Sequence, residues 1–176
     1  MTKIFISGSM DRKARHITWI CLSVIAVILL LLWLFWGEGG YILAWGASLF
    51  AAVLLLYIMS IPRKVIVSDN SVEIRCVVES VNIKYSDLRT IRRLQADDMK
   101  RKYVLLGSYG FFGYYGCYLE PDTLETVNLY CKQWDNFVEI TDAFERRYIV
   151  SVLDPEGLIS ATTQALRFYS DSNAIE

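Results

Sequence analysis

The hydropathy of the chain changes sharply near residue 62. Before that point lie two long apolar runs, residues 17–36 and 41–61, and neither contains Asp, Glu, Lys, Arg or His. The glycine-rich segment 37–40 separates the two runs. About 20 apolar residues in a helix are enough to cross a hydrocarbon core about 30 Å thick. The pattern therefore predicts a transmembrane hairpin of two helices over residues 17–61.

A cleaved signal sequence is the alternative interpretation of the first run. It requires a shorter apolar core and a cleavage site of small residues. This run instead ends in the bulky residues 32–36, and a second apolar run follows it. We therefore favour two membrane spans.

The basic residues next to the two runs predict the orientation of the hairpin. Residues 1–16 form a basic N-terminal segment, Arg63 and Lys64 follow the second run, and the tip carries Glu38. By the positive-inside rule, both termini are cytoplasmic, and the two runs make the chain a multi-pass membrane protein. Small residues four apart, Ala47 and Ala51, fit packing on the first helix or a homo-oligomer interface.

After residue 62 the apolar residues recur at every second position, which is typical of strands with one buried face. Seven stretches are expected to be strands, at residues 64–68, 72–78, 81–85, 88–94, 127–131, 137–141 and 147–152. The period then changes. Asp154 is a suitable N-cap and Pro155 suits the first helical position, so an amphipathic helix of about fifteen residues is expected.

These elements predict an α+β, mainly β domain over residues 62–170, followed by a polar tail, 171–176. Seven strands and one C-terminal helix suit a small antiparallel barrel or orthogonal sandwich, with the helix covering the open end. From residue 62 onward the chain has 14 lysines and arginines against 17 aspartates and glutamates. This acidic balance argues against a nucleic-acid partner.

Catalytic chemistry is poorly represented in the polar part. It contains no histidine, which excludes Ser-His-Asp and Cys-His catalysis there. Cysteines 76, 117 and 131 lack metal-ligand spacing. We expect no catalytic residues, no metal and no cofactor, and hence no enzyme.

Two features could contact a lipid or a protein partner. The first is a basic cluster: Arg92, Arg93, Lys100, Arg101 and Lys102. It could meet anionic headgroups or form a solvated end of a hairpin balanced by acidic neighbours. The second is segment 107–116, with a glycine at every third position and the aromatic residues Tyr109, Phe111, Phe112, Tyr114 and Tyr115 between them. It could be an ordered, bent loop or an exposed aromatic surface.

Segment 109–116, with its Gly113-Tyr114-Tyr115-Gly116 end, resembles the Gly-aromatic signature of small bacterial PH-like (pleckstrin-homology-like) domains. The resemblance extends through residues 83–88 and covers most of residues 63–169. It implies a PH-like, seven-stranded split barrel with a capping C-terminal helix, in a bacterial inner-membrane protein. PH domains that bind phosphoinositides use basic residues near the first strand turn, whereas the turn here, residues 68–71, carries Asp69 and no cation.

Three classes of function follow. The first is a membrane-anchored interaction or scaffold module, integral to the bilayer and binding a membrane protein or a second copy. The second is a domain that senses anionic lipid through the basic cluster and the Gly-aromatic segment. The third, an enzyme, has no support from the residues. We favour the first.

Overall fold

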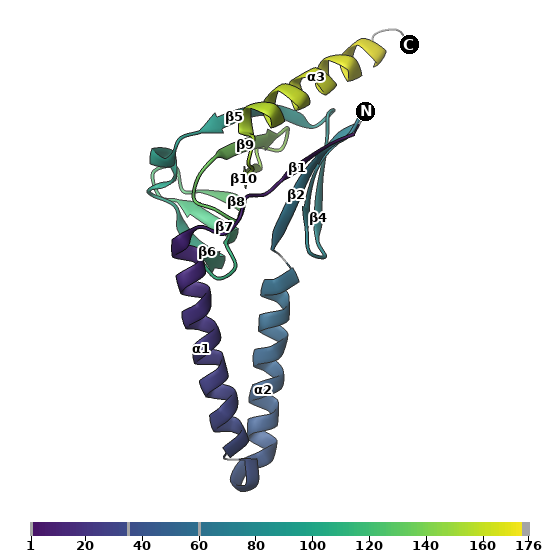
Figure 1. Ribbon diagram of the computed structural model, residues 1–176. Coiled ribbons are helices and arrows are strands. Elements are labelled where there is room, and N and C mark those ends of the chain that lie inside the picture. Colours follow the sequence, from purple (N-terminus) through teal and green to yellow (C-terminus); the bar gives the residue numbers. More distant parts are fainter. Residues whose placement is uncertain (1, 35, 60, 174–176) are drawn as a thin grey trace.

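The computed structural model describes residues 2–34, 36–59 and 61–173. A β domain carries two long helices at one end and a third helix at the other (Figure 1). The elements follow one another as β1 (Lys3–Ile6), α1 (Arg12–Leu34), α2 (Trp36–Met59), β2 (Pro62–Val67), β3 (Ser71–Cys76), β4 (Ser80–Lys84), β5 (Leu88–Leu94), the 3-10 helix η1 (Ala96–Met99), β6 (Tyr103–Tyr109), β7 (Tyr114–Glu120), β8 (Glu125–Cys131), β9 (Phe137–Asp142), β10 (Arg147–Ser151) and α3 (Pro155–Asn173).

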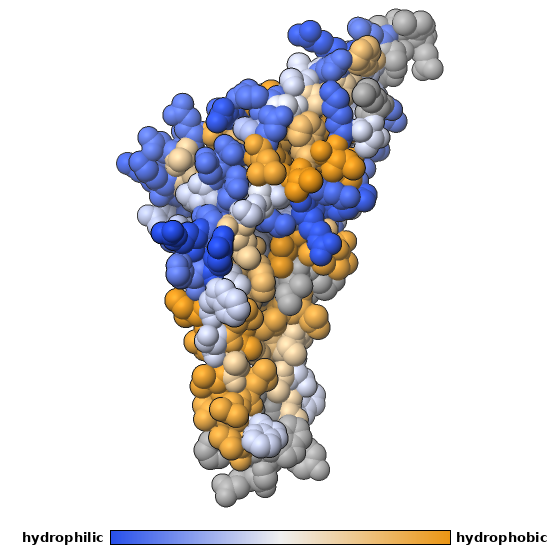
Figure 2. Space-filling model, in the orientation of Figure 1, coloured by the Kyte–Doolittle hydropathy of each residue, from blue (hydrophilic) through white to orange (hydrophobic). Residues whose placement is uncertain are grey.

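The helices α1 and α2 lie side by side and project away from the β domain (Figure 1). Figure 2 shows hydrophobic residues gathered on them, while most of the β domain and α3 is hydrophilic. Within the described residues, one helix, Arg12–Leu31, is long and apolar enough to cross a membrane, and Ala44–Leu55 is a shorter apolar stretch. Two spans are therefore not confirmed. The expected connector, residues 37–40, lies inside α2, and the side chain of Glu38 lies outside the described residues.

The first sheet has the order β1-β2-β3-β4 and is antiparallel throughout. Its outer strand, β1, comes from the N-terminal segment that precedes the two helices, and Lys3 pairs with Val67 at one end of its register. The sequence analysis treated this segment only as a basic flank. The N-terminal segment is thus part of the β domain, and the two helices are inserted between neighbouring strands of one sheet.

The second sheet has the order β5-β9-β10-β8-β7-β6. All of its pairs are antiparallel except β8 with β10. The described part of the chain therefore contains ten strands, so the expectation of seven is not confirmed. The strands missed by the sequence analysis are β1 and the pair β6 and β7, which flank the Gly-aromatic turn.

The C-terminal helix α3 begins as its sequence predicts. The carboxylate of Asp154 accepts a hydrogen bond from the backbone N–H of Gly157 at 2.8 Å, and Pro155 is the first helical residue. The helix buries Leu158 and Ala161 against the core formed between the two sheets. It runs to Asn173, further than the fifteen residues expected. The mainly β domain with a C-terminal helix is confirmed.

A second core lies at the end of the domain from which α1 and α2 project. It contains Tyr114, Tyr118, Leu129 and Phe137 of the second sheet, together with Ala14 from the first turn of α1. Because Ala14 is fully buried there, α1 is packed into the β domain rather than tethered to it by a free linker.

Candidate functional site

The Gly-aromatic segment is a tight β-hairpin turn between β6 and β7. The N–H of Gly110 donates to the carbonyl of Gly113 at 2.8 Å, and the Ser108 hydroxyl lies 2.8 Å from the carbonyl of Phe111. Both turn glycines have positive φ. Three register steps further, Gly107 faces Gly116, and a Cβ on Gly116 would lie 2.6 Å from the Cα of Gly107. The glycines at every third position therefore allow the hairpin to bend sharply and let its backbone approach neighbouring backbone closely at two places.

This turn docks on the start of α1. The buried hydroxyl of Thr18 accepts a hydrogen bond from the N–H of Phe112 at 2.9 Å, and it lies 2.8 Å from the carbonyl of Ala14 and 3.2 Å from that of Gly110. The side chain of Ile17 fills the space in front of Gly110, where a Cβ would meet it at 2.5 Å. The turn is thus joined to the helix by the hydrogen bond to the Thr18 hydroxyl and by the packing of Ile17 on Gly110, which has no side chain.

A second contact lies at Asp11, the residue immediately before α1. The carboxylate of Asp11 accepts a hydrogen bond from the N–H of Ala14 at 2.7 Å, as an N-cap does. The same carboxylate accepts the hydroxyl of Tyr114 at 3.0 Å. Burial and the negative charge of Asp11 raise the pKa of Tyr114, which therefore stays a neutral donor. Sequence reasoning missed Asp11, although an Asp immediately before a helix is a recognisable N-cap signal.

The five aromatic residues of the segment are not one exposed surface. Tyr114 and Tyr115 are buried, Phe111 and Phe112 are half-buried, and Tyr109 is 43% exposed. The ordered-loop interpretation fits these positions, with the difference that the loop packs on α1 as well as on its own sheet. Tyr109 is also covered in part, because the ammonium of Lys13 lies 4.9 Å from its ring centre.

The basic cluster lies on β5 and in the connection between η1 and β6, and all five of its members pair with carboxylates. The nitrogen–oxygen distances run from 2.5 to 3.4 Å, in the pairs Arg92–Glu139, Arg93–Glu156, Lys100–Asp97, Arg101–Asp122 and Lys102–Glu120. The cluster is therefore not a free positive patch.

The basic cluster adjoins a network of buried and half-buried charged side chains centred on Arg147. This guanidinium contacts Glu139 at 2.6 Å and Glu120 at 2.5 Å, and the buried ammonium of Lys102 holds the other oxygen of Glu120. Burial disfavours the charge of Arg147, but its hydrogen bonds to the two glutamates outweigh that effect and raise its pKa. Burial likewise opposes ionisation of Glu120, yet Lys102 and Arg147 lower its pKa overall. A cavity of about 550 Å³ beside the network carries both signs of charge.

Six of the basic residues that have no ion-pair partner among the described residues lie near the ends of α1 and α2 that meet the β domain. These residues are Arg12, Lys13, Arg15, Arg63, Lys64 and Lys132. Burial lowers the pKa of Lys132, and the nearby charge of Arg63 lowers it further. Two like charges are thus held close together at the start of β2.

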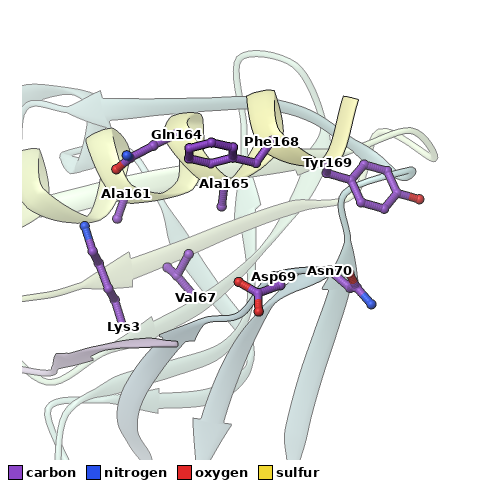
Figure 3. Close-up of a pocket in the computed structure, with 9 residues that line it drawn as sticks. All are labelled: Lys3, Val67, Asp69, Asn70, Ala161, Gln164, Ala165, Phe168 and Tyr169. Atoms are coloured by element: carbon purple, nitrogen blue, oxygen red, sulfur yellow. The ribbon is translucent and has the colours of Figure 1, made fainter. Parts of the chain in front are cut away.

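The far side of the domain carries a groove of about 530 Å³ between α3 and the first sheet. Figure 3 shows Lys3 of β1 pointing toward α3, and Asp69 and Asn70 of the β2–β3 turn beneath Tyr169. Since β2 starts directly after α2 and runs to this turn, the groove lies away from the projecting helices (Figure 1). The sequence analysis missed it because it did not predict β1.

The class of protein follows from these elements: a mainly β domain of two sheets, closed by a C-terminal helix and carrying an apolar N-terminal helix. Residues 63–166 match the family described as Bacterial PH domain, so the chain belongs to that family. Comparison with curated proteins and with solved structures gives no match. The matched range starts at β2 and therefore leaves out β1 and both projecting helices.

Proposed function

We propose that this chain is a membrane-anchored interaction module, in which α1 and α2 hold a PH-like domain at the cytoplasmic face of the inner membrane. The observation that carries the proposal is the uncovered apolar surface of α1, where Trp19, Ile20 and Val27 are each more than half exposed. A patch of this kind is not left in water by a soluble monomer. Because the first turns of α1 are packed into the β domain, an inserted α1 would fix that domain at the membrane surface.

Charge supports the same placement. The six unpaired basic residues lie where the projecting helices meet the β domain, which is the position that the positive-inside rule gives to the cytoplasmic side. Two spans would return the chain to the side from which it entered, so that β1 and β2 can pair.

Anchoring is tested with the full-length chain in bacterial membranes. We expect it to resist alkaline carbonate extraction. In variants with a single cysteine, a membrane-impermeant maleimide should label Glu38→Cys in intact spheroplasts but label Cys117 only after lysis. Extraction by carbonate, or labelling of both sites from the same side, would refute the two-span anchor.

The interaction role is assigned to the groove beneath α3, because it is concave, partly apolar and directed away from the projecting helices. We expect Ala165→Trp, which fills the groove, to abolish the crosslinks that the wild-type chain forms in cells with a membrane protein or a second copy. Ser170→Trp, outside the groove on the same helix, should preserve them. Equal crosslinking by both variants would remove the groove from the proposal.

Sensing of anionic lipid is the alternative function. The ion pairs of Arg92, Arg93, Lys100, Arg101 and Lys102 weigh against it, because a lipid phosphate would have to displace a carboxylate from each cation. Hydrogen exchange of residues 92–102, measured on the full chain in nanodiscs with and without anionic lipid, separates the two functions. Protection that depends on anionic lipid would favour lipid sensing.

PH-like domains are typically non-catalytic, and we assign no reaction to this one. Among the described residues, His, Cys, Asp and Glu side chains form no group of three or more that could hold a metal. The buried thiols of Cys76 and Cys131 are poor nucleophiles, because burial raises the pKa of each to about 12.

A further inference from the structure

An apolar groove of about 320 Å³ lies between α1 and α2, close to the β domain. Its walls consist entirely of hydrocarbon and sulfur-bearing side chains: Ile20, Cys21, Val24, Ile25, Ile28, Phe50, Val53, Leu54 and Phe111. The groove is open toward the surroundings, since Val24 and Val53 are each about half exposed. The side chains of α1 and α2 therefore do not fill the space between the two helices along this stretch.

The Gly-aromatic turn forms the upper end of this groove. Phe111 is the one lining residue from the β domain, and its ring contacts that of Phe112 at 4.7 Å between centroids. The hydrogen bond from Phe112 to Thr18 holds the turn against α1. Phe111 is thus kept in place at the end of the groove nearest the polar domain.

A cation stands above the groove on the same face of α1. Lys13, Ile17, Ile20, Val24 and Ile28 follow one another at spacings of three or four residues, so they form one stripe along the helix. Lys13 has no carboxylate partner among the described residues, and its ammonium lies 3.4 Å from the hydroxyl of Tyr109. The stripe thus begins at the positive charge of Lys13 and continues along the apolar groove.

We propose that this groove holds one acyl chain of a membrane phospholipid, with the phosphate of that lipid bound by Lys13. The proposal rests on the proposed function, because the groove meets acyl chains only if α1 lies in the bilayer. The apolar groove would open sideways into the hydrocarbon of the bilayer, and the unpaired ammonium of Lys13 would lie above it at the polar interface. A phospholipid has the matching arrangement, with apolar acyl chains below a charged headgroup. The Gly-aromatic turn is then the element that shapes the lipid site, and the basic cluster takes no part in it.

The test uses the full chain in nanodiscs that contain phosphatidylglycerol with a photoreactive diazirine in its acyl chain. We expect adducts on peptides that contain the groove residues of α1 and α2. Val24→Phe fills the groove and should lower this labelling several-fold. The matched control is Val27→Phe, which places the same side chain at an equally exposed position of α1 outside the groove and should leave labelling unchanged.

The headgroup contact is tested separately with Lys13→Gln. This variant should lower labelling by the phosphatidylglycerol probe but leave labelling by a diacylglycerol probe with the same acyl chain unchanged, because diacylglycerol has no phosphate for Lys13 to bind. Equal losses with both probes, or no loss, would overturn the role of Lys13.

Carbonate extraction of each variant keeps the two proposals apart. A chain that is extracted refutes the membrane anchor. A chain that stays inserted but is labelled evenly around both helices, with Val24→Phe and Val27→Phe acting alike, refutes the acyl-chain site alone. Loss of a homodimer in Val24→Phe without any change in lipid labelling would assign the groove to a second copy and would equally overturn the proposal.

Discussion

At the residue scale, the glycines of this chain differ sharply in whether they leave room for a side chain. Gly116 has φ of 110°, and a Cβ there would lie 2.3 Å from the carbonyl oxygen of Leu106. Gly46, in α2, has no heavy atom within 4 Å of the position that a Cβ would take. The same chemical change, glycine to alanine, therefore has opposite consequences at the two sites.

We expect Gly116→Ala to destabilise the chain by at least 1–3 kcal/mol (order of magnitude), the usual cost of a strained backbone, because it adds a backbone clash. Gly46→Ala should be neutral or slightly stabilising, since glycine weakens a helix interior. Thermal unfolding of the full chain in detergent, followed by tryptophan fluorescence, compares the two variants. An unchanged melting temperature for Gly116→Ala would contradict the close approach of β6 and β7.

The sequence alone identified the residues whose partners are local. Asp154 and Pro155 begin α3 through groups at most three residues away, so the pattern was sufficient. The contacts of Thr18 with Phe112 and of Asp11 with Tyr114 could not be assigned in this way, because these partners lie 94 and 103 residues further along the chain. No local pattern carries information about such contacts.

At the scale of elements, the Thr18 hydroxyl accepts the backbone hydrogen bond that joins the β6–β7 turn to α1. Thr18→Val keeps the shape of the side chain but leaves the N–H of Phe112 without its acceptor. Such a loss costs about 1–3 kcal/mol. We therefore expect faster hydrogen exchange at Phe112 and its neighbours, together with a lower melting temperature.

Ser23→Ala is the matched control for this substitution. The Ser23 hydroxyl bonds only to the carbonyl of Trp19 in its own helix, at an exposed position. It should change neither the exchange at the turn nor the melting temperature. If both variants behave alike, the turn is held to α1 by something other than Thr18.

Element prediction succeeded where alternation was clear and failed where it was not. Strands such as β3 and β8 showed period-two patterns and were found. β6 begins Tyr103-Val104-Leu105-Leu106, a continuous apolar run with a register shift, and its first four side chains are all exposed to some degree. β1 has only four residues beside basic neighbours, so its strand character depends on β2, which is remote in sequence.

At the scale of the whole molecule, acid should weaken the domain through Glu120. Its pKa is lowered in the folded chain, so its contribution to stability is full above the unfolded value, near 4.5, and is lost as the pH falls through the folded pKa. We expect Glu120→Gln to be less stable than wild type at pH 7, with the difference shrinking as the pH falls below 4.5.

Melting temperatures measured between neutral and acidic pH check this expectation. Glu145→Gln is the control, because its ion pair with Arg89 is largely exposed and contributes little. A constant difference between Glu120→Gln and wild type across the pH range would show that the charge network around Arg147 does not depend on ionised Glu120.

The order of the strands also constrains how the chain is made. β1 is synthesised first, but its partner β2 follows only after both long helices, so β1 has no neighbour to pair with until some 55 residues later. Domains generally fold as units while the chain emerges. Here β1 stays unpaired until both helices and β2 have been synthesised. The pairing of β1 with β2 then brings together the two ends of the segment that contains the helices. A fragment that starts at residue 62 would lack β1 and would expose the edge of β2 as a site for aggregation.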